Sequence, residues 1–159
     1  MTSKPHHRWT RILPGAITRA LLMVSVGVVP LLGATEPVSI WEGIYTDVQA
    51  ARGKEVFIRA CVECHSNQLG EMAGDGTAPS LLGETFSYRW TDYSIAGLFD
   101  TIRQTMPEAA PNSLGPAEYA DVTAYLLKLN GYPAGASELD YAKRELLGRT
   151  FIDEKPPED

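Results

Sequence analysis

The two cysteines of this chain stand in one five-residue motif, Cys61-Val62-Glu63-Cys64-His65. C-x-x-C-H is the spacing at which two thiols are joined covalently to the vinyl groups of a haem. Cysteines separated by two residues lie on one turn of backbone and face neighbouring vinyl groups, and the next residue places its imidazole under the iron. The motif therefore predicts one covalently attached haem c, with Cys61 and Cys64 as attachment points and His65 as an axial ligand.

The same motif has three other interpretations: a thioredoxin-like dithiol, part of a zinc site, or chance. A dithiol oxidoreductase carries C-x-x-C beside a strand-helix-strand pattern, whereas the residues before Cys61 have helical periodicity. Structural zinc takes four Cys or His ligands. After the first seven residues the chain offers only Cys61, Cys64 and His65. The sequence favours haem attachment over these alternatives.

The first 34 residues have the parts of a secretory signal peptide. They carry four basic residues and no acidic one, then an apolar run from Ala20 to Leu32, then the small residues Gly33 and Ala34. A run of 13 residues is shorter than the about 20 that span a bilayer. We predict a signal peptide, export to the periplasm and no stable membrane span. An uncleaved membrane anchor is the alternative.

Without its first 34 residues the chain has 125 residues, a size that suits one domain with a single core. Ten basic and 20 acidic residues remain, which gives a net charge of −10. A nucleic-acid binder or a ligand of anionic membranes needs a positive surface, so the sequence predicts neither function. We expect redox protein partners whose docking surfaces are neutral or basic.

Apolar residues recur at helical spacing in three stretches, 47–60, 93–104 and 116–129. Thr91 or Asp92 is the expected cap of the second stretch. Residues 66–92 are rich in Gly, Pro and Asn and predict a long loop. These patterns predict a mainly helical domain.

Gly53 lies inside the first predicted helix, where glycine costs about 1 kcal/mol relative to alanine. The usual reason for such a glycine is the close approach of another backbone. We expect the predicted helix 116–129 to supply that backbone, so that the two helices cross at Gly53. The alternative is a frayed helix.

A second axial ligand from this chain, once the signal peptide is removed, is Met72 or Met106, because no histidine but His65 remains. Met72 lies only seven residues beyond His65 and would have to pass around the haem edge at once. Met106 precedes Pro107, which ends the preceding helix and favours extended backbone at Met106. We predict Met106 as the ligand; a methionine that fills a gap in the core is the alternative.

Residues 47–132 resemble the small monohaem class I cytochromes c. The resemblance rests on a helix with Gly53 and Phe57, the Cys61–His65 motif, Ala78-Pro79-Ser80-Leu81, Met106-Pro107, and a closing helix with Tyr125-Leu126. It implies an all-α class I cytochrome c fold, with three to five helices around a covalently attached haem and long loops. It also implies that the Pro79 carbonyl accepts a hydrogen bond from the His65 ring and that Met106 ligates the iron.

Finer similarity points to the cytochromes that accept electrons from periplasmic quinoprotein dehydrogenases. The similar segments are Trp41-Glu42-Gly43-Ile44-Tyr45, Ala50-Ala51-Arg52-Gly53, Met106-Pro107 with Ala110-Pro111 and Ser113-Leu114, and residues 129–135. This resemblance implies a separate quinoprotein dehydrogenase as electron donor; the alternative is that the likeness reflects descent alone. We expect an oxidase or another terminal acceptor as recipient.

Tyr88 and Trp90 each combine an apolar ring with one hydrogen-bond donor, so both are candidates to bind a haem propionate; aromatic core packing is the alternative. With His65 and Met106 on the iron, no position is open for a substrate. The sequence therefore predicts a one-electron carrier and not an enzyme. A haem enzyme or sensor, in which Met106 is absent from the iron or displaced, is the competing hypothesis.

The resemblance and the composition divide the chain into four predicted parts. They are a signal peptide (1–34), an N-terminal extension (35–46), a cytochrome c domain (47–133), and a C-terminal helix with a mobile tail (134–159). Within the last part, residues 137–149 predict an amphipathic helix, and residues 152–159 predict the tail because they are acidic and contain two adjacent prolines.

Overall fold

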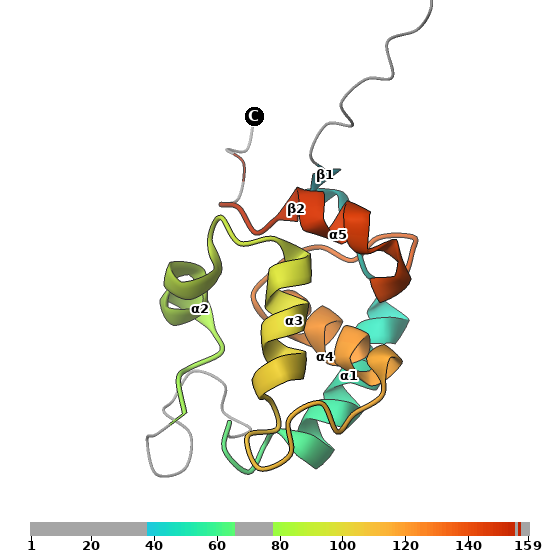
Figure 1. The fold of residues 1–159 in the computed structure, drawn as a ribbon. Coiled ribbons are helices and arrows are strands. Elements are labelled where there is room, and N and C mark those ends of the chain that lie inside the picture. Colours follow the sequence, from blue (N-terminus) through green and yellow to red (C-terminus); the bar gives the residue numbers. More distant parts are fainter. Residues whose placement is uncertain (1–37, 66–77, 155, 157–159) are drawn as a thin grey trace, which may run out of the picture. The chain divides into compact units, whose positions relative to one another are not determined.

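The computed structural model describes residues 38–65, 78–154 and 156. The α-helices of this part of the chain are α1 (Asp47–Ala60), α2 (Gly83–Trp90), α3 (Ile95–Thr105), α4 (Pro116–Leu129) and α5 (Arg144–Arg149) (Figure 1). Two short 3-10 helices, η1 (Ile40–Glu42) and η2 (Tyr141–Lys143), and two strands of two residues, β1 (Val38–Ser39) and β2 (Thr150–Phe151), complete it. The predicted all-α class is confirmed.

The ends of α1 and α4 follow from their capping residues. The Thr46 hydroxyl accepts a hydrogen bond of 3.1 Å from the backbone N–H of Gln49, which satisfies one of the free donors of the first turn. At the start of α4, Pro116 occupies the first helical position and the Glu118 carboxylate accepts a hydrogen bond of 2.9 Å from the N–H of Gly115. The bounds predicted for these two helices are confirmed.

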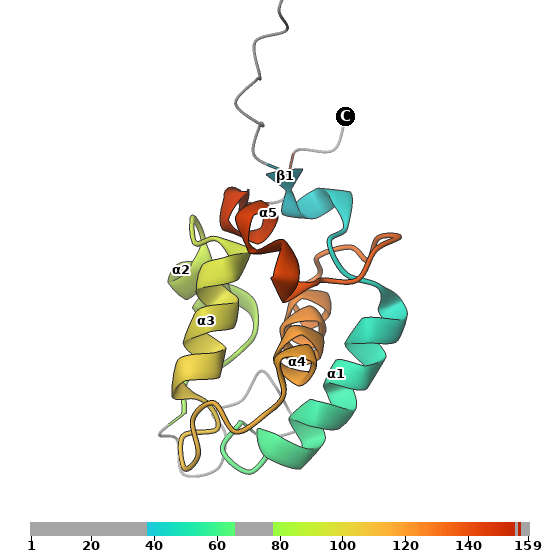
Figure 2. The ribbon, with the colours of Figure 1, turned by 45° about the vertical axis from the view of Figure 1, so that its right-hand side comes forward.

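Helices α1 and α4 lie side by side in both views (Figure 1 and Figure 2). A Cβ atom on Gly53 would overlap the backbone carbonyl of Asp121 and would come within 2.9 Å of Cβ of Tyr125. Only glycine lets the two backbones approach this closely. The predicted crossing of the two helices at Gly53 is confirmed.

The main hydrophobic core joins the second half of the domain to the segment before α1. Its largest fully buried side chains are Ile40, Tyr45, Phe86, Ile95, Leu98, Phe99, Tyr119, Leu127 and Ile152. Two of them, Ile40 and Tyr45, precede α1, so the segment before α1 contributes to the same core as α3 and α4. Burial of this apolar surface is the main stabilising contribution to the fold.

Helix α2 lies where the sequence predicted a loop, so that prediction was wrong over residues 83–90. The helix has eight residues, and its N-cap residue, Leu82, offers no capping side chain. Phe86 and Trp90, four residues apart, are both buried in the main core. The helix is therefore stabilised by tertiary burial of one face, and its sequence carries no start signal that would have revealed it.

Helix α3 begins at Ile95, two residues after the predicted start. Its cap is Ser94, whose hydroxyl accepts a hydrogen bond of 3.1 Å from the N–H of Gly97. The predicted cap Asp92 has a positive φ of 69°, and its N–H donates to the carbonyl of Ile152 instead. A contact with the distant C-terminal segment thus decides where the helix begins.

The C-terminal segment differs from its prediction. The 3-10 turn η2 and the short helix α5 replace the single helix predicted over residues 137–149. Strand β2 pairs in parallel with β1, with Thr150 opposite Val38. Ile152, predicted to begin a mobile tail, is fully buried and exchanges backbone hydrogen bonds with the 92–93 turn, at 2.8 and 2.9 Å.

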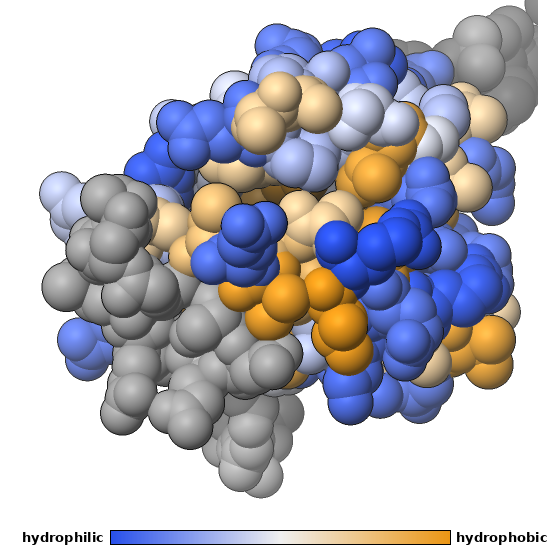
Figure 3. Space-filling view, turned by 90° about the horizontal axis from the view of Figure 1, so that it is seen from below, coloured by the Kyte–Doolittle hydropathy of each residue, from blue (hydrophilic) through white to orange (hydrophobic). Residues whose placement is uncertain are grey.

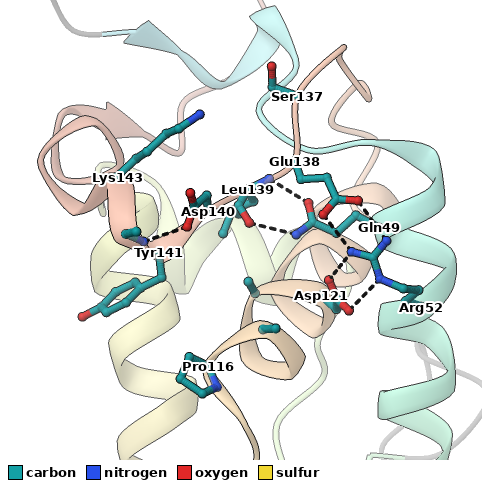
Figure 4. Close-up of a pocket in the computed structure, with 13 residues that line it drawn as sticks. Gln49, Arg52, Pro116, Asp121, Ser137, Glu138, Leu139, Asp140, Tyr141 and Lys143 are labelled. Atoms are coloured by element: carbon teal, nitrogen blue, oxygen red, sulfur yellow. Dashed lines mark hydrogen bonds and ion pairs between the residues drawn. The ribbon is translucent and has the colours of Figure 1, made fainter.

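Polar contacts also join this segment to α1 and α4 (Figure 4). The side-chain amide of Gln49 donates to the carbonyl of Leu139 at 2.8 Å and accepts from its N–H at 2.7 Å. The guanidinium of Arg52 makes paired hydrogen bonds to Asp121, at 2.9 and 3.0 Å, and to Glu138, both at 2.9 Å. One arginine therefore connects α1, α4 and the residues that follow α4.

Several predictions concern residues outside the described part of the chain. They are the signal peptide over residues 1–34, residues 35–37 of the predicted extension, residues 66–77 of the predicted loop with the candidate ligand Met72, and residues 155 and 157–159 of the predicted tail. Among the described residues, none of the helices combines the length and the apolar character needed to cross a membrane.

Candidate functional site

The Cys61–His65 motif forms a tight turn at the end of α1. The N–H of Cys61 donates to the carbonyl of Phe57 at 2.9 Å, and the carbonyl of Cys61 accepts from the N–H groups of Cys64 and His65, at 3.2 and 2.8 Å. The motif is thereby wound onto one turn, as its spacing predicts. Both cysteines are free thiols; Cys61 is partly buried and Cys64 is exposed.

The cysteine environment argues against a dithiol enzyme. Burial raises the pKa of the Cys61 thiol to about 11, with the nearby Arg59 acting in the opposite direction and Cys64 adding to the rise. The attacking cysteine of a C-x-x-C oxidoreductase has a lowered pKa, because its thiolate is the reactive form. Cys61 has the opposite shift.

His65 is half-buried, and one nitrogen of its ring has no hydrogen-bond partner among the described residues. That atom is Nδ1, which is buried. Burial lowers the pKa of His65, and the backbone carbonyl of Pro79 acts in the opposite direction as a nearby hydrogen-bond acceptor. The pKa shift favours the neutral imidazole, the form that binds a metal.

A second apolar cluster, separate from the main core, lies against this turn. Val56, Phe57, Val122 and Leu126 form its buried centre between α1 and α4. The side chains that are only partly covered are Cys61, Val62, Leu81, Ile102, Leu114, Tyr125 and Leu129. Figure 3 views the end of the molecule at which α1 and α3 finish, and hydrophobic side chains reach the surface there.

The partly covered residues come from several segments. Cys61 and Val62 belong to the His65 turn, and Leu81 follows Pro79. Ile102 and Leu114 lie before and after Met106 along the chain and also pack against the main core, and the remaining two come from α4. An apolar cluster contacted from these segments and incompletely covered fits a flat hydrophobic group held between them.

Met106 stands directly after α3, as predicted. The helix ends at Thr105, and Met106 has extended backbone with φ −126° and ψ 149°. Its N–H donates to the carbonyl of Ile102 at 2.8 Å, and its own carbonyl accepts a hydrogen bond of 2.8 Å from the hydroxyl of Tyr119. The side chain is partly exposed, on a loop whose backbone is fixed at this residue.

A comparison with known protein families agrees with this arrangement. Residues 48–126, which run from the first turn of α1 into α4, match the family model described as "Cytochrome C oxidase, cbb3-type, subunit III". This match supports a monohaem c-type cytochrome domain over these residues. Searches among curated proteins and among solved structures gave no significant match.

The cofactor that this family match implies is haem c, and the residues described here fit it. Cys61 and Cys64 are free thiols on one turn, and a partly covered apolar cluster lies beside them. His65 follows directly on this turn, and its buried, unpartnered Nδ1 together with a lowered pKa fits a neutral imidazole that could ligate the iron. Bound haem supplies reversible one-electron chemistry at its iron.

Tyr88 and Trp90, the two residues predicted to bind a haem propionate, lie on different sides of α2. Tyr88 is 95% exposed, whereas Trp90 is buried in the main core and packs edge-on against Tyr93, with ring centroids 5.6 Å apart. The two side chains are therefore not brought together, and their role as propionate donors stays a prediction.

Sequence reasoning missed one residue of this site, Tyr119. It lies within the predicted helix 116–129, where its ring belongs to the apolar stripe, yet its hydroxyl contacts the loop that carries Met106. The available signal was its residue type, because a tyrosine in a buried stripe must find a partner for its hydroxyl. Which partner it finds depends on the tertiary structure.

Proposed function

We propose that this cytochrome is exported to the periplasm and carries one electron at a time, with His65 and Met106 as the two axial ligands of its haem iron. The observation that carries the proposal is the apolar cluster between α1 and α4. Its partly covered members come both from the segments around His65 and from those around Met106, which supports a haem held between the two residues.

Two protein ligands leave no position on the iron for a substrate, so the residues around it serve electron transfer rather than catalysis. A methionine ligand opposite histidine favours the reduced iron and gives a higher potential than two nitrogen ligands. The chain contributes fixed ligands, an apolar environment that excludes water, and a surface at which a redox partner docks.

We propose a periplasmic dehydrogenase of the quinoprotein class as the electron donor and a terminal oxidase as the acceptor. The donor rests on the sequence resemblance described above, and the acceptor is supported by the matched family, which is described as a subunit of a cytochrome c oxidase. The net charge of −10 after residue 34 favours partners with basic docking surfaces. Partner reduction and oxidation rates should therefore fall as ionic strength rises.

Ligation is tested with Met106→Ala and, as the matched control, Met72→Ala, each matured with covalent haem. In the oxidised wild-type protein we expect the weak methionine-to-iron charge-transfer band. Met106→Ala should lose that band and bind added imidazole or cyanide, whereas Met72→Ala should keep the band. Loss of the band in Met72→Ala alone would transfer the ligand role to Met72. Imidazole binding by the wild-type protein, with no such band, would favour the sensor or enzyme hypothesis.

Partner choice and export need separate measurements. Stopped-flow mixing with a purified quinoprotein dehydrogenase, and then with membranes that contain a cbb3-type oxidase, should show reduction followed by oxidation on the time scale of turnover. Absence of both reactions would contradict the proposed partners.

N-terminal sequencing of the mature protein from a periplasmic fraction should give a start near Thr35; an intact Met1 would contradict cleavage.

A further inference from the structure

One buried hydroxyl contacts both ends of the loop that carries Met106. Tyr119 lies in the first half of α4 and is fully buried. Its hydroxyl donates to the carbonyl of Met106 at 2.8 Å and accepts a longer, weaker hydrogen bond of 3.4 Å from the N–H of Leu114. The residues that begin and end this loop therefore share one partner in α4.

The ring that carries this hydroxyl is held in place independently of the loop. It packs edge-on against Phe99 of α3, with ring centroids 6.2 Å apart, and belongs to the main core. Its backbone N–H donates to the carbonyl of Gly115 at 3.1 Å, within the first turn of α4. A rigid ring places its hydroxyl at a fixed point, so the hydrogen bond fixes the position of the loop.

Met106 is also held by its own N–H, which donates to the carbonyl of Ile102 at 2.8 Å, but in the described part of the chain no other hydrogen bond of the loop reaches the Met106 carbonyl. The N–H of Ala110 donates to Pro107 at 2.8 Å, and the N–H of Asn112 donates to Arg103 at 2.9 Å. They shape the middle of the loop. The contact with Tyr119 acts on Met106 itself, the residue whose thioether is proposed to reach the iron.

We propose that Tyr119 is a positioning residue that keeps the Met106 thioether on the haem iron by holding the Met106 carbonyl. The inference rests on the proposed function, because it requires Met106 to be the ligand. A carbonyl fixed by a buried donor restrains the attached Cα and hence the reach of the side chain. Without the hydroxyl, the loop departs more often from the bound position, and the iron opens to external ligands.

The variant that tests this is Tyr119→Phe, which removes the hydroxyl and keeps the ring. Tyr45→Phe is the matched control, since Tyr45 is equally buried and its hydroxyl also donates to a backbone carbonyl, that of Tyr132. Both variants lose one buried hydrogen bond, but only Tyr119 contacts the Met106 loop. The readout is the apparent dissociation constant of imidazole for the oxidised, haem-loaded protein, followed by absorbance.

We expect Tyr119→Phe to bind imidazole about three to ten times more tightly than the wild type, the factor that corresponds to loss of one net hydrogen bond. Its methionine charge-transfer band should weaken, and its far-ultraviolet circular dichroism should not change. Tyr45→Phe should bind imidazole within about twofold of the wild type. Equal imidazole affinity in Tyr119→Phe and the wild type would overturn the inference, as would the same gain in both variants.

A second background separates this inference from the proposed function. In Met106→Ala the iron is already open, so adding Tyr119→Phe should change imidazole affinity little, and the two effects should be non-additive. If Met106→Ala itself leaves the spectrum unchanged, the proposed ligation fails and the inference fails with it. If Met106→Ala opens the iron but Tyr119→Phe has no effect, only the role of Tyr119 is refuted.

Discussion

The backbone carbonyl of Asp121 occupies the space that a methyl group on Gly53 would require. Helices α1 and α4 therefore meet backbone to backbone at this point. The turn that carries Cys61 begins where α1 ends, eight residues after Gly53. The crossing thus sets the direction in which α1 presents the haem-attachment motif and the apolar cluster beside it.

We predict that Gly53→Ala destabilises the protein by about 1–3 kcal/mol or more, the range seen when a close-packed contact is overfilled. The cost arises because the added Cβ meets backbone, which cannot rotate away as a side chain does. Urea denaturation of the haem-loaded protein, followed by circular dichroism, measures the change in the free energy of unfolding.

Gly148→Ala is the control for this experiment. Gly148 lies in α5, and a Cβ there would find nothing within 4 Å. Alanine is favoured over glycine in a helix by about 1 kcal/mol, so this variant should be neutral or slightly more stable. A Gly53→Ala protein as stable as Gly148→Ala would show that the two helices do not cross this closely.

Arg52 should contribute more to stability than an ordinary surface arginine. Its partner Asp121 is largely buried and receives two hydrogen bonds from it. We expect Arg52→Ala to cost about 1–3 kcal/mol, because it leaves the Asp121 carboxylate without these donors. Arg52→Lys should restore only part of that loss, since an ammonium group cannot form the paired geometry.

Lys128→Ala provides the comparison for Arg52. Lys128 pairs with Asp47 across the same two helices, at 2.5 Å, but both side chains are exposed. Such pairs contribute at most about 1 kcal/mol. Chemical denaturation of both variants should therefore show the larger loss for Arg52→Ala, and equal losses would contradict the importance of burial at Asp121.

The end of the described chain should matter for stability. Ile152 is fully buried, and its neighbour Phe151 is 43% exposed. We predict that Ile152→Ala lowers the free energy of unfolding by about 2–5 kcal/mol, and that Phe151→Ala lowers it by less. Thermal unfolding of the two variants tests this. Similar transition temperatures for Ile152→Ala and the wild type would restore the earlier expectation of a mobile tail from this residue.

Stability at alkaline pH should depend on Tyr45. Burial, and secondarily the charge of Asp47, raise the pKa of Tyr45 from 10 to about 12. The folded state therefore keeps this hydroxyl protonated where the unfolded chain releases the proton. The contribution of Tyr45 to the free energy of unfolding is therefore complete below pH 10. It falls as the pH rises from 10 toward 12, by up to about 1.4 kcal/mol for each pH unit.

Tyr45→Phe should reduce this loss. The variant is expected to be less stable at pH 7, because the hydrogen bond to Tyr132 is gone, and to have a shallower decline between pH 10 and 12. Some decline should remain, since the pKa values of Tyr125 and Tyr132 are also raised by burial. Urea titrations at several pH values measure both slopes, and identical slopes would refute the role of Tyr45.

The sequence by itself determined the features whose signals are local. The haem-attachment motif follows from the spacing of Cys61, Cys64 and His65, and the bounds of α1 and α4 follow from periodicity and capping residues. Extended backbone at Met106 follows from the proline after it. In each case the physical cause lies within a few residues of its effect.

Only the tertiary structure decided the features that depend on distant contacts. Helix α2 forms because Phe86 and Trp90 are buried by other segments, and Ile152 is ordered by the 92–93 turn rather than by its own sequence. The hydroxyl of Tyr119 finds its partner 13 residues away, at Met106. Burial and long-range hydrogen bonds have no local pattern, so the apolar stripe of α4 indicated that Tyr119 is buried but not which group its hydroxyl would hold.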